Sequence, residues 1–385
     1  MFLVHLLLFV GFIQIEPNGP AVDSTAAQAI QAHAYSLMRS GKFCEAIGPL
    51  QELKEANNND VPGRAALVES LFKCGKRQEG EEELKQFWGL PSATPADQLN
   101  MAKILAGDHF PAESQQTLER LLAASPDNAE AHARLGTLLF NQNQYEPAVR
   151  HLGRAVQLDP SSARFAMQLA EALLRAKQFP VALEFLSAVK DRFGALPEYQ
   201  YKLAWAHYGM RQLPQAATEL EALVRQHPDL DLPHYSLGNC YIVLGRLGEA
   251  EQQYRTAIRL QPSRASYYDA LAQVLRKQGA GKVDEAMANL EQALRLAPHD
   301  AQAQVQLALC YEQKGNLGKA QQNLEAAIRN EPDLVDAHRV LARVYYRQGN
   351  APQGDREAAV VSKLDSQQLH HRSQELGFGT SDDSF

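Results

Sequence analysis

Apolar residues recur along the chain at the spacing of amphipathic helices, in pairs of segments joined by short polar turns. Leu135, Leu138 and Leu139 fall on one face of a predicted helix, and Leu152 and Val156 fall on one face of the next. Each helix therefore has a single apolar stripe to bury. A hairpin of two such helices cannot bury both stripes alone, so the pattern predicts that hairpins stack on one another.

The helix-pair pattern repeats with a period of 34 residues, which is typical of stacked supersecondary units. Proline ends a helical stretch at matching places: Pro126, Pro160, Pro228, Pro262, Pro298 and Pro332. The gaps are multiples of 34, except for 36 residues between Pro262 and Pro298. We assign the two extra residues to the turn around Gly279, Ala280 and Gly281, where an insertion leaves helix contacts undisturbed.

Extending this register predicts ten units. They begin at Ala27, Val61, Pro95, Ala129, Ala163, Pro197, Asp231, Ala265, Ala301 and Val335. The eighth place of a unit is nearly always small, as in Ala34, Ala102, Gly136, Ala204 and Gly238, and so is the twentieth, as in Ala46, Ser114, Ala148, Ala250 and Ala320. Small residues on both sides of a turn let the two helices of a hairpin approach closely.

The pattern resembles the motif of the tetratricopeptide repeat family: small residues stand at the eighth and twentieth places, Tyr or Leu stands between them, and Pro ends most units. The resemblance covers roughly residues 27–368, and it implies an all-α, right-handed superhelical solenoid of antiparallel helix pairs. Asn58, Ser92 and Ser366 stand where proline is expected, so the first two units and the last are interpreted as caps or as repeats that match the motif less well. We expect one continuous body over residues 22–368.

In this family, ligands mostly contact the second, fifth, ninth, twelfth and thirteenth places of the first helices, which line a concave groove. On that basis the partner-binding residues are expected to be Met167, Arg175, Tyr201, Trp205, Tyr208, Tyr235, Asn239 and Ile242. Aromatic side chains at places not needed for hairpin packing are typical interaction hot spots. The alternative interpretation is that these aromatics pack against neighbouring units.

Other residue patterns that could form a binding or catalytic site are weaker. The chaperone-type members of the family hold acidic tails with lysine and asparagine, but Tyr235 stands where a lysine is needed. Arg339, Arg343 and Arg347 share a face and could bind an acidic partner, or form a solvated end. No zinc-protease, nucleophile-elbow or phosphate-loop motif occurs. The sequence therefore predicts no enzymatic activity, no cofactor and no metal.

Charge and cysteine content refine this picture. The 385 residues include 38 Lys and Arg against 45 Asp and Glu, a net charge of −7, which argues against a nucleic-acid partner. Cys44 begins the second helix of the first unit and Cys74 ends the first helix of the next, so we hypothesise a disulfide between them. The alternative is free thiols at both places. Cys240 and Cys310 lie two units apart, beyond disulfide reach.

The N-terminus carries an apolar run from Phe2 to Ile13, too short to span a bilayer comfortably. We interpret residues 1–21 as a cleaved signal peptide, which predicts export to the periplasm or the extracellular space. An uncleaved membrane anchor, an ordinary helix and a misassigned start are the alternatives, and no other stable membrane span is expected. Residues 369–385 are expected to form a polar C-terminal tail.

Together these features predict a non-enzymatic, exported bacterial-type scaffold that binds protein segments or peptides in its groove. The alternative is an accessory subunit or chaperone of a cell-envelope assembly or a glycan-processing complex.

Overall fold

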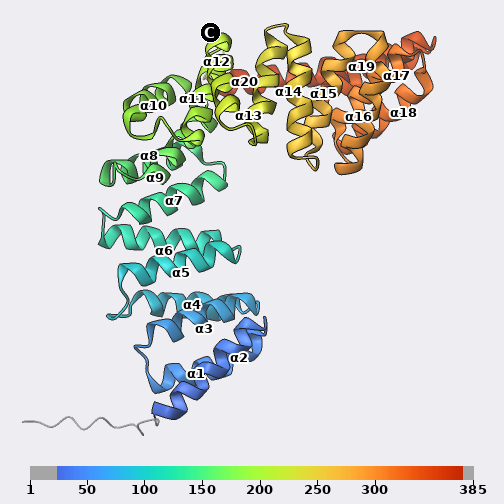
Figure 1. The fold of residues 1–385 in the computed structure, drawn as a ribbon. Helices are drawn as coiled ribbons and strands as arrows, with labels where there is room; N and C mark the ends of the chain where they lie inside the picture. The colour runs from blue at the N-terminus through green and yellow to red at the C-terminus, as the bar shows by residue number, and fades with distance from the viewer. Residues whose placement is uncertain (1–23, 376–385) are drawn as a thin grey trace, which may run out of the picture. The chain divides into compact units, whose positions relative to one another are not determined.

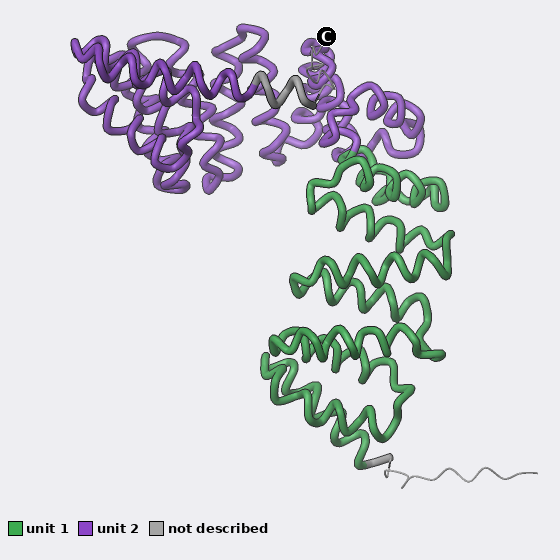
Figure 2. Tube along the Cα trace, turned by 180° about the vertical axis from the view of Figure 1, so that it is seen from behind, with its two compact units in different colours: residues 1–172 green, residues 173–385 purple. Residues whose placement is uncertain are grey.

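A computed structural model describes residues 24–375, which form α-helices and one short 3₁₀ helix joined by turns, with no strand in that range. The chain divides into two compact units, residues 1–172 and 173–385 (Figure 2). The division falls inside helix α9, Ala163–Arg175. The repeat register does not predict it, because helix pairs continue through this point.

Within each unit, helices pack mainly on those that precede and follow them in the chain (Figure 1). Before α9, the first unit contains α1 Ser24–Arg39, α2 Phe43–Ala56, α3 Val61–Lys73, α4 Arg77–Trp88, α5 Pro95–Gly107, α6 Pro111–Ala124, α7 Ala129–Asn141 and α8 Tyr145–Leu158. After α9, the second contains α10 Phe179–Phe193, α11 Pro197–Gly209, α12 Leu213–Gln226, α13 Asp231–Val243, α14 Leu247–Leu260, α15 Ala265–Gln278, the short 3₁₀ helix η1 Ala280–Lys282, α16 Val283–Leu296, α17 Ala301–Gln313, α18 Leu317–Asn330, α19 Val335–Arg347 and α20 Ala351–Glu375.

The all-α fold of helix pairs predicted from the sequence is confirmed. From α3 onward, every odd-numbered helix to α15, and then α17 and α19, begins at the residue where the register places a unit. The first unit differs, because α1 begins at Ser24 rather than at Ala27. Proline and the polar residues after it set several of these starts. Asn128 Oδ1, for example, accepts a hydrogen bond from the Ala131 backbone N–H at 2.9 Å and caps α7.

The small residues at the eighth and twentieth places are buried throughout the described units. Gly238 shows why size matters there. A Cβ atom added to Gly238 would lie 2.6 Å from the ring of Tyr254, which is fully buried on the second helix of the same pair. The close approach of α13 to α14 therefore depends on the missing side chain.

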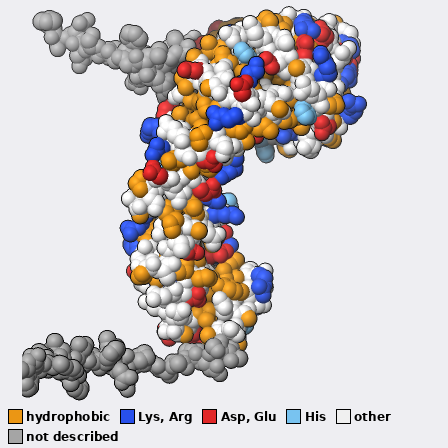
Figure 3. Space-filling model, turned by 60° about the vertical axis from the view of Figure 1, so that its left-hand side comes forward, with side chains coloured by type: hydrophobic (Ala, Val, Ile, Leu, Met, Phe, Trp, Pro, Cys, Tyr) orange, Lys and Arg blue, Asp and Glu red, His pale blue; other side chains and the backbone are white. Residues whose placement is uncertain are grey.

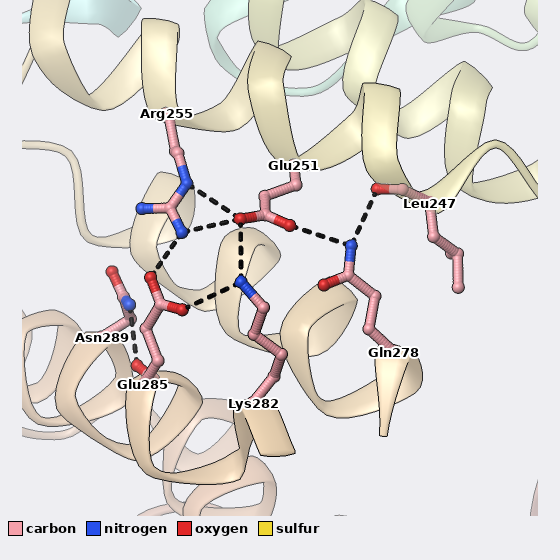
Figure 4. Close-up of polar contacts among 7 residues, drawn as sticks. All are labelled: Leu247, Glu251, Arg255, Gln278, Lys282, Glu285 and Asn289. Atoms are coloured by element: carbon pink, nitrogen blue, oxygen red, sulfur yellow. Dashed lines mark hydrogen bonds and ion pairs between the residues drawn. The ribbon is translucent and has the colours of Figure 1, made fainter. Parts of the chain in front are cut away.

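The longer turn of the eighth unit contains the three-residue helix η1, after Gly279 at the end of α15, where the spacing of the prolines places the two extra residues. A polar network closes this longer turn against its neighbours (Figure 4). Gln278 donates to Glu251 on α14 at 2.9 Å, and Arg255 pairs both with Glu251 and with Glu285 on α16. Although partial burial alone would raise the pKa of Glu251, the hydrogen bonds from Arg255 and Gln278 lower it overall.

The two ends of the chain concern the expected signal peptide, the membrane spans and the polar tail. The expected signal peptide, residues 1–21, lies outside the described residues. None of the helices described between residues 24 and 375 is long and apolar enough to cross a membrane. Helix α20 continues to Glu375, into the segment expected to be a polar tail, and the remainder of that segment lies outside the described residues.

Hydrophobic side chains reach the surface of both units between charged ones (Figure 3). Large apolar residues that are more than a third exposed are Val181, Leu196, Met210, Leu232, Val243, Leu296 and Tyr346. Scattered exposure of this kind is ordinary in soluble proteins. A site therefore has to be recognised by a cavity and by residues that converge on it.

Candidate functional site: an aromatic pocket between α11 and α13

Three aromatic residues stand along one face of α11. Tyr201, Trp205 and Tyr208 are spaced by four and three residues, which places them one above another on the helix. All three are only partly buried, whereas Ala204 and Ala206 beside them are fully buried in the core. Tyr201 and Tyr208 also pack against the core of the second unit, so the aromatic face of α11 adjoins the stripe that packs the helix pair.

The aromatic face of α11 meets α13 at a pocket of about 220 Å³ that lies wholly within the second unit. Its lining is Tyr201, Ala204, Trp205, Tyr208, Leu220, Leu232, Tyr235, Ser236, Asn239 and Cys240. Five of the residues that the sequence predicted for partner binding are among them. We call this cavity the aromatic pocket.

Neighbouring side chains hold the rings of the aromatic pocket in place. The hydroxyl oxygens of Tyr201 and Ser236 are 3.0 Å apart and form a hydrogen bond between α11 and α13. The ring of Tyr235 stacks on that of Tyr267 from α15, with centroids 4.8 Å apart. It also contacts Tyr254, with centroids 5.7 Å apart. Such ring pairs favour one arrangement of the pocket wall.

Asn239 provides a polar group at the pocket wall. Its Oδ1 accepts a hydrogen bond of 2.6 Å from the hydroxyl of Tyr254. Burial raises the pKa of Tyr254, so this hydroxyl stays protonated and remains the donor. The bond fixes the orientation of the Asn239 amide, and its nitrogen is a donor group in the lining.

The lining of the aromatic pocket carries no charged side chain. Cys240 is buried, and burial raises the pKa of its thiol to about 11. A thiol with this pKa is neutral near pH 7 and is a poor nucleophile. The pocket can therefore bury an apolar group and offer it a few hydrogen bonds, but its chemistry does not suit proton transfer or covalent attack.

The structure separates the remaining predicted groove residues from the aromatic pocket. Ile242 is half-buried against the core next to the pocket, and Arg175 is exposed on α9. Met167 is only 3% exposed on α9, and its part in partner binding stays a prediction. The low exposure arises because α9 is buried on more than one stripe: its buried residues are Phe165, Ala166, Met167, Leu169, Ala170, Ala172, Leu173 and Leu174.

A second pocket of about 220 Å³ lies in the first unit and was missed by the sequence analysis. Its lining is Ala102, Lys103, Ala106, Ser114, Leu118, Arg134, Thr137, Leu138, Asn141, Arg164 and Gln168. Glu130 pairs with both Arg134 and Arg164, so one carboxylate faces two guanidinium groups. Lys103 is the ninth residue of the third unit, and Trp205 is the ninth residue of the sixth. A lysine at a place expected to face the groove was the sequence signal for this pocket.

Other candidate residues are engaged in structural contacts. Arg343 and Arg347 both bind Glu312, and Arg339 pairs with Asp336, so the cations of α19 are paired within the chain. A disulfide joins Cys44 to Cys74, whose Cα atoms are 5.0 Å apart. No group of three potential metal ligands gathers anywhere in the described part of the chain.

Comparisons with known proteins agree with this architecture. Two family models, both described as tetratricopeptide repeat, match the chain. One matches residues 134–197, 201–265 and 314–354, and the other matches residues 110–154 and 278–333. No curated protein matches the chain significantly.

Solved structures that resemble the chain include human IFIT1, solved as a dimer with m7Gppp-AAAA, and two MamA proteins. IFIT1 is 15% identical, with a TM-score of 0.48, over 90% of this chain and 92% of its own. One MamA is 17% identical, with a TM-score of 0.40, over 44% of this chain and 97% of its own. MamA from Desulfovibrio magneticus is 20% identical, with a TM-score of 0.41, over 45% and 96%.

Proposed function

Because the chain belongs to the tetratricopeptide repeat family, whose members bind protein partners, we propose that it is a non-enzymatic scaffold that anchors partner segments in the aromatic pocket. The observation that carries the proposal is the convergence of Tyr201, Trp205, Tyr208 and Tyr235 on one cavity. Aromatic residues of this kind dominate the binding energy of many protein interfaces.

The size of the aromatic pocket supports a side chain as its occupant. Sites that enclose whole small molecules measure roughly 300–1,000 Å³. At about 220 Å³, the aromatic pocket suits one large apolar or aromatic side chain of a partner. The partner would then present that side chain from a helix or an extended segment.

The arrangement of the pocket favours affinity and orientation. The ring contacts of Tyr235 and the hydrogen bond of Tyr201 fix these side chains before a partner arrives, which reduces the entropy lost on binding. Ser236 and Asn239 supply polar groups at the same wall, where they can pair with the partner backbone and set its direction.

The proposal is tested by site-specific crosslinking in the cell. We expect p-benzoylphenylalanine at Leu232, which lines the pocket and is 36% exposed, to crosslink a defined segment of a partner. The matched control is the same photoreactive residue at Val181, which is 49% exposed and lies outside the lining. Equal crosslinking of the same segment from both positions contradicts the proposal.

An accessory subunit or chaperone of a larger assembly is the alternative function. Affinity purification of the full chain distinguishes the two, because an accessory subunit retains one partner at fixed stoichiometry. A scaffold that binds short segments is instead purified with several partners that share an apolar anchor residue.

We further propose that the chain is exported. Disulfides persist in oxidising compartments, so the Cys44–Cys74 bond supports this location together with the apolar N-terminal run. Export with cleavage predicts a mature protein that begins near Val22, as measured by N-terminal mass spectrometry. Recovery of the full-length chain only from the cytoplasmic fraction contradicts it.

A further inference from the structure

Three units share a histidine at their fourth place, and its ring is tied to the preceding unit in the same way. Nε2 lies 2.9 Å from the Pro126 carbonyl oxygen in His132, 3.2 Å from that of Pro228 in His234, and 2.9 Å from that of Pro332 in His338. A carbonyl oxygen can only accept a hydrogen bond, so Nε2 carries a proton in all three rings. Nδ1 is then the nitrogen left to face the second helix.

The residue that faces Nδ1 differs among the three units. It stands nineteen residues later, at the twenty-third place. Gln253 Oε1 lies 2.6 Å from His234 Nδ1, and Glu357 Oε2 lies 2.6 Å from His338 Nδ1, so in both units an oxygen that can accept a hydrogen bond from a protonated Nδ1 faces this nitrogen. In the fourth unit the facing residue is a second histidine, and the Nδ1 atoms of His132 and His151 are 3.1 Å apart.

The contact between the two imidazoles limits the number of protons they can hold. His132 donates through Nε2, so its Nδ1 is the acceptor and His151 Nδ1 is the donor. One additional proton fits on Nε2 of His151. A second has to occupy His132 Nδ1, which removes the acceptor and places two positive rings side by side.

Other charges around the pair do not remove this conflict. Burial first, and then the charges of His132 and Arg150, lower the pKa of His151, and Glu119 on α6 offsets them only in part. Nearby carboxylates are already engaged. Asp127 pairs with Arg154 at 2.6 Å, and Glu130 pairs with Arg134 and with Arg164 of α9.

We propose that the α7–α8 hairpin is a pH-sensitive joint, which opens when both His132 and His151 take up protons in mildly acidic solution. The hairpins α13–α14 and α19–α20 lack the second imidazole and stay closed. Helix α7 also carries Arg134, Thr137 and Asn141 of the second pocket, so opening would remodel that pocket. The joint is independent of the function proposed for the aromatic pocket.

The sign and size of the effect follow from proton uptake. An unhindered histidine has a pKa of about 6.5, so below this pH the open hairpin binds at least one proton more than the closed one. The closed form is then disfavoured as pH falls. The opening equilibrium is expected to rise about tenfold between pH 7.5 and pH 5.5 for each extra proton.

Hydrogen exchange of the full chain at pH 7.5 and pH 5.5, corrected for the intrinsic rates, tests the proposal. Opening of α7–α8 is expected to rise about tenfold or more, and α13–α14 serves as the internal control because His234 faces Gln253 there. An equal change in both hairpins overturns the proposal.

Two variants use residues that the chain itself places at the same positions. His151→Gln copies the seventh unit, and His132→Gln copies the ninth, where Gln304 Nε2 lies 3.5 Å from the Pro298 carbonyl oxygen. Each variant is expected to abolish the pH response of α7–α8 while keeping the hairpin closed at pH 7.5. If His151→Gln does not fold, His132→Gln tests the proposal in its place. A tenfold response that persists in a folded variant overturns the proposal.

Discussion

At the scale of single residues, the backbone at the fifteenth place is left-handed in nine of the ten units, the exception being Gly279, and its occupant is either glycine or a residue with a side chain. Gly245 has a φ of +77°, in the left-handed region where glycine has no steric penalty. Arg211, at the same place between α11 and α12, has a φ of +62°, which is strained for a residue with a Cβ atom. The repeat register locates this turn from the sequence. It does not reveal that an arginine adopts the glycine conformation.

Replacing Arg211 with glycine is expected to stabilise the protein by about 1 kcal/mol, because the strain at Cβ disappears. Arg211→Ala is the control, since alanine also removes the long side chain but keeps the Cβ atom. Urea unfolding followed by circular dichroism measures both. The interpretation is wrong if the alanine variant gains as much as the glycine variant.

The opposite change is expected at Gly238. Gly238→Ala places a methyl group against the fully buried ring of Tyr254 and should destabilise the second unit by about 1–3 kcal/mol. Gly153→Ala is the matched control, because a Cβ atom at this position in α8 meets nothing within 4 Å. It should stabilise the helix by up to about 1 kcal/mol. Equal effects of the two variants in thermal unfolding would contradict the close approach of α13 to α14.

At the scale of elements, the sequence predicted most helix starts because proline, caps and small residues act locally. Two features of the helices differ from what the register alone indicates, one for a non-local reason and one for a local reason. Helix α9 places Met167 in the interior, since burial of a helix depends on all its neighbours and not on its own repeat position. Helix α20 runs on to Glu375 because no proline or glycine interrupts it between Gly354 and that residue.

The Cys44–Cys74 bond connects the start of α2 to the end of α3 across 30 residues of sequence. A crosslink of this span is expected to stabilise the two N-terminal helix pairs by roughly 3 kcal/mol. Thiol labelling of the denatured protein should detect two reactive thiols without reductant, Cys240 and Cys310, and four with it. Four reactive thiols without reductant rule out the bond in solution.

At the scale of the whole molecule, the two units present chemically different pockets. The aromatic pocket in the second unit is lined by uncharged residues, whereas the pocket in the first unit has Lys103, Arg134 and Arg164 in its lining. The net charge of −7 conceals this difference. The sequence placed the aromatic residues on one face through the repeat register, but their closure into a cavity depends on Leu220 and Ser236, which no motif identified.

An uncharged lining predicts that binding at the aromatic pocket depends little on salt. The affinity of the segment crosslinked at Leu232 should change less than about threefold between 50 mM and 500 mM NaCl, because screening acts on charges and not on apolar burial. Isothermal titration measures this. A loss of affinity of tenfold or more would mean that charged residues outside the pocket provide most of the binding energy.

The most direct test of the scaffold is the affinity of that same partner segment for the Trp205→Ala variant. Truncating an aromatic anchor that the partner covers should weaken binding by at least about 2 kcal/mol, or roughly thirtyfold, while the circular dichroism spectrum stays unchanged. Tyr346→Ala, which removes an aromatic residue that is 47% exposed and lies outside the pocket, should bind like the unmodified chain. If the Trp205→Ala variant is folded and binds the segment unchanged, the aromatic pocket is not the binding site.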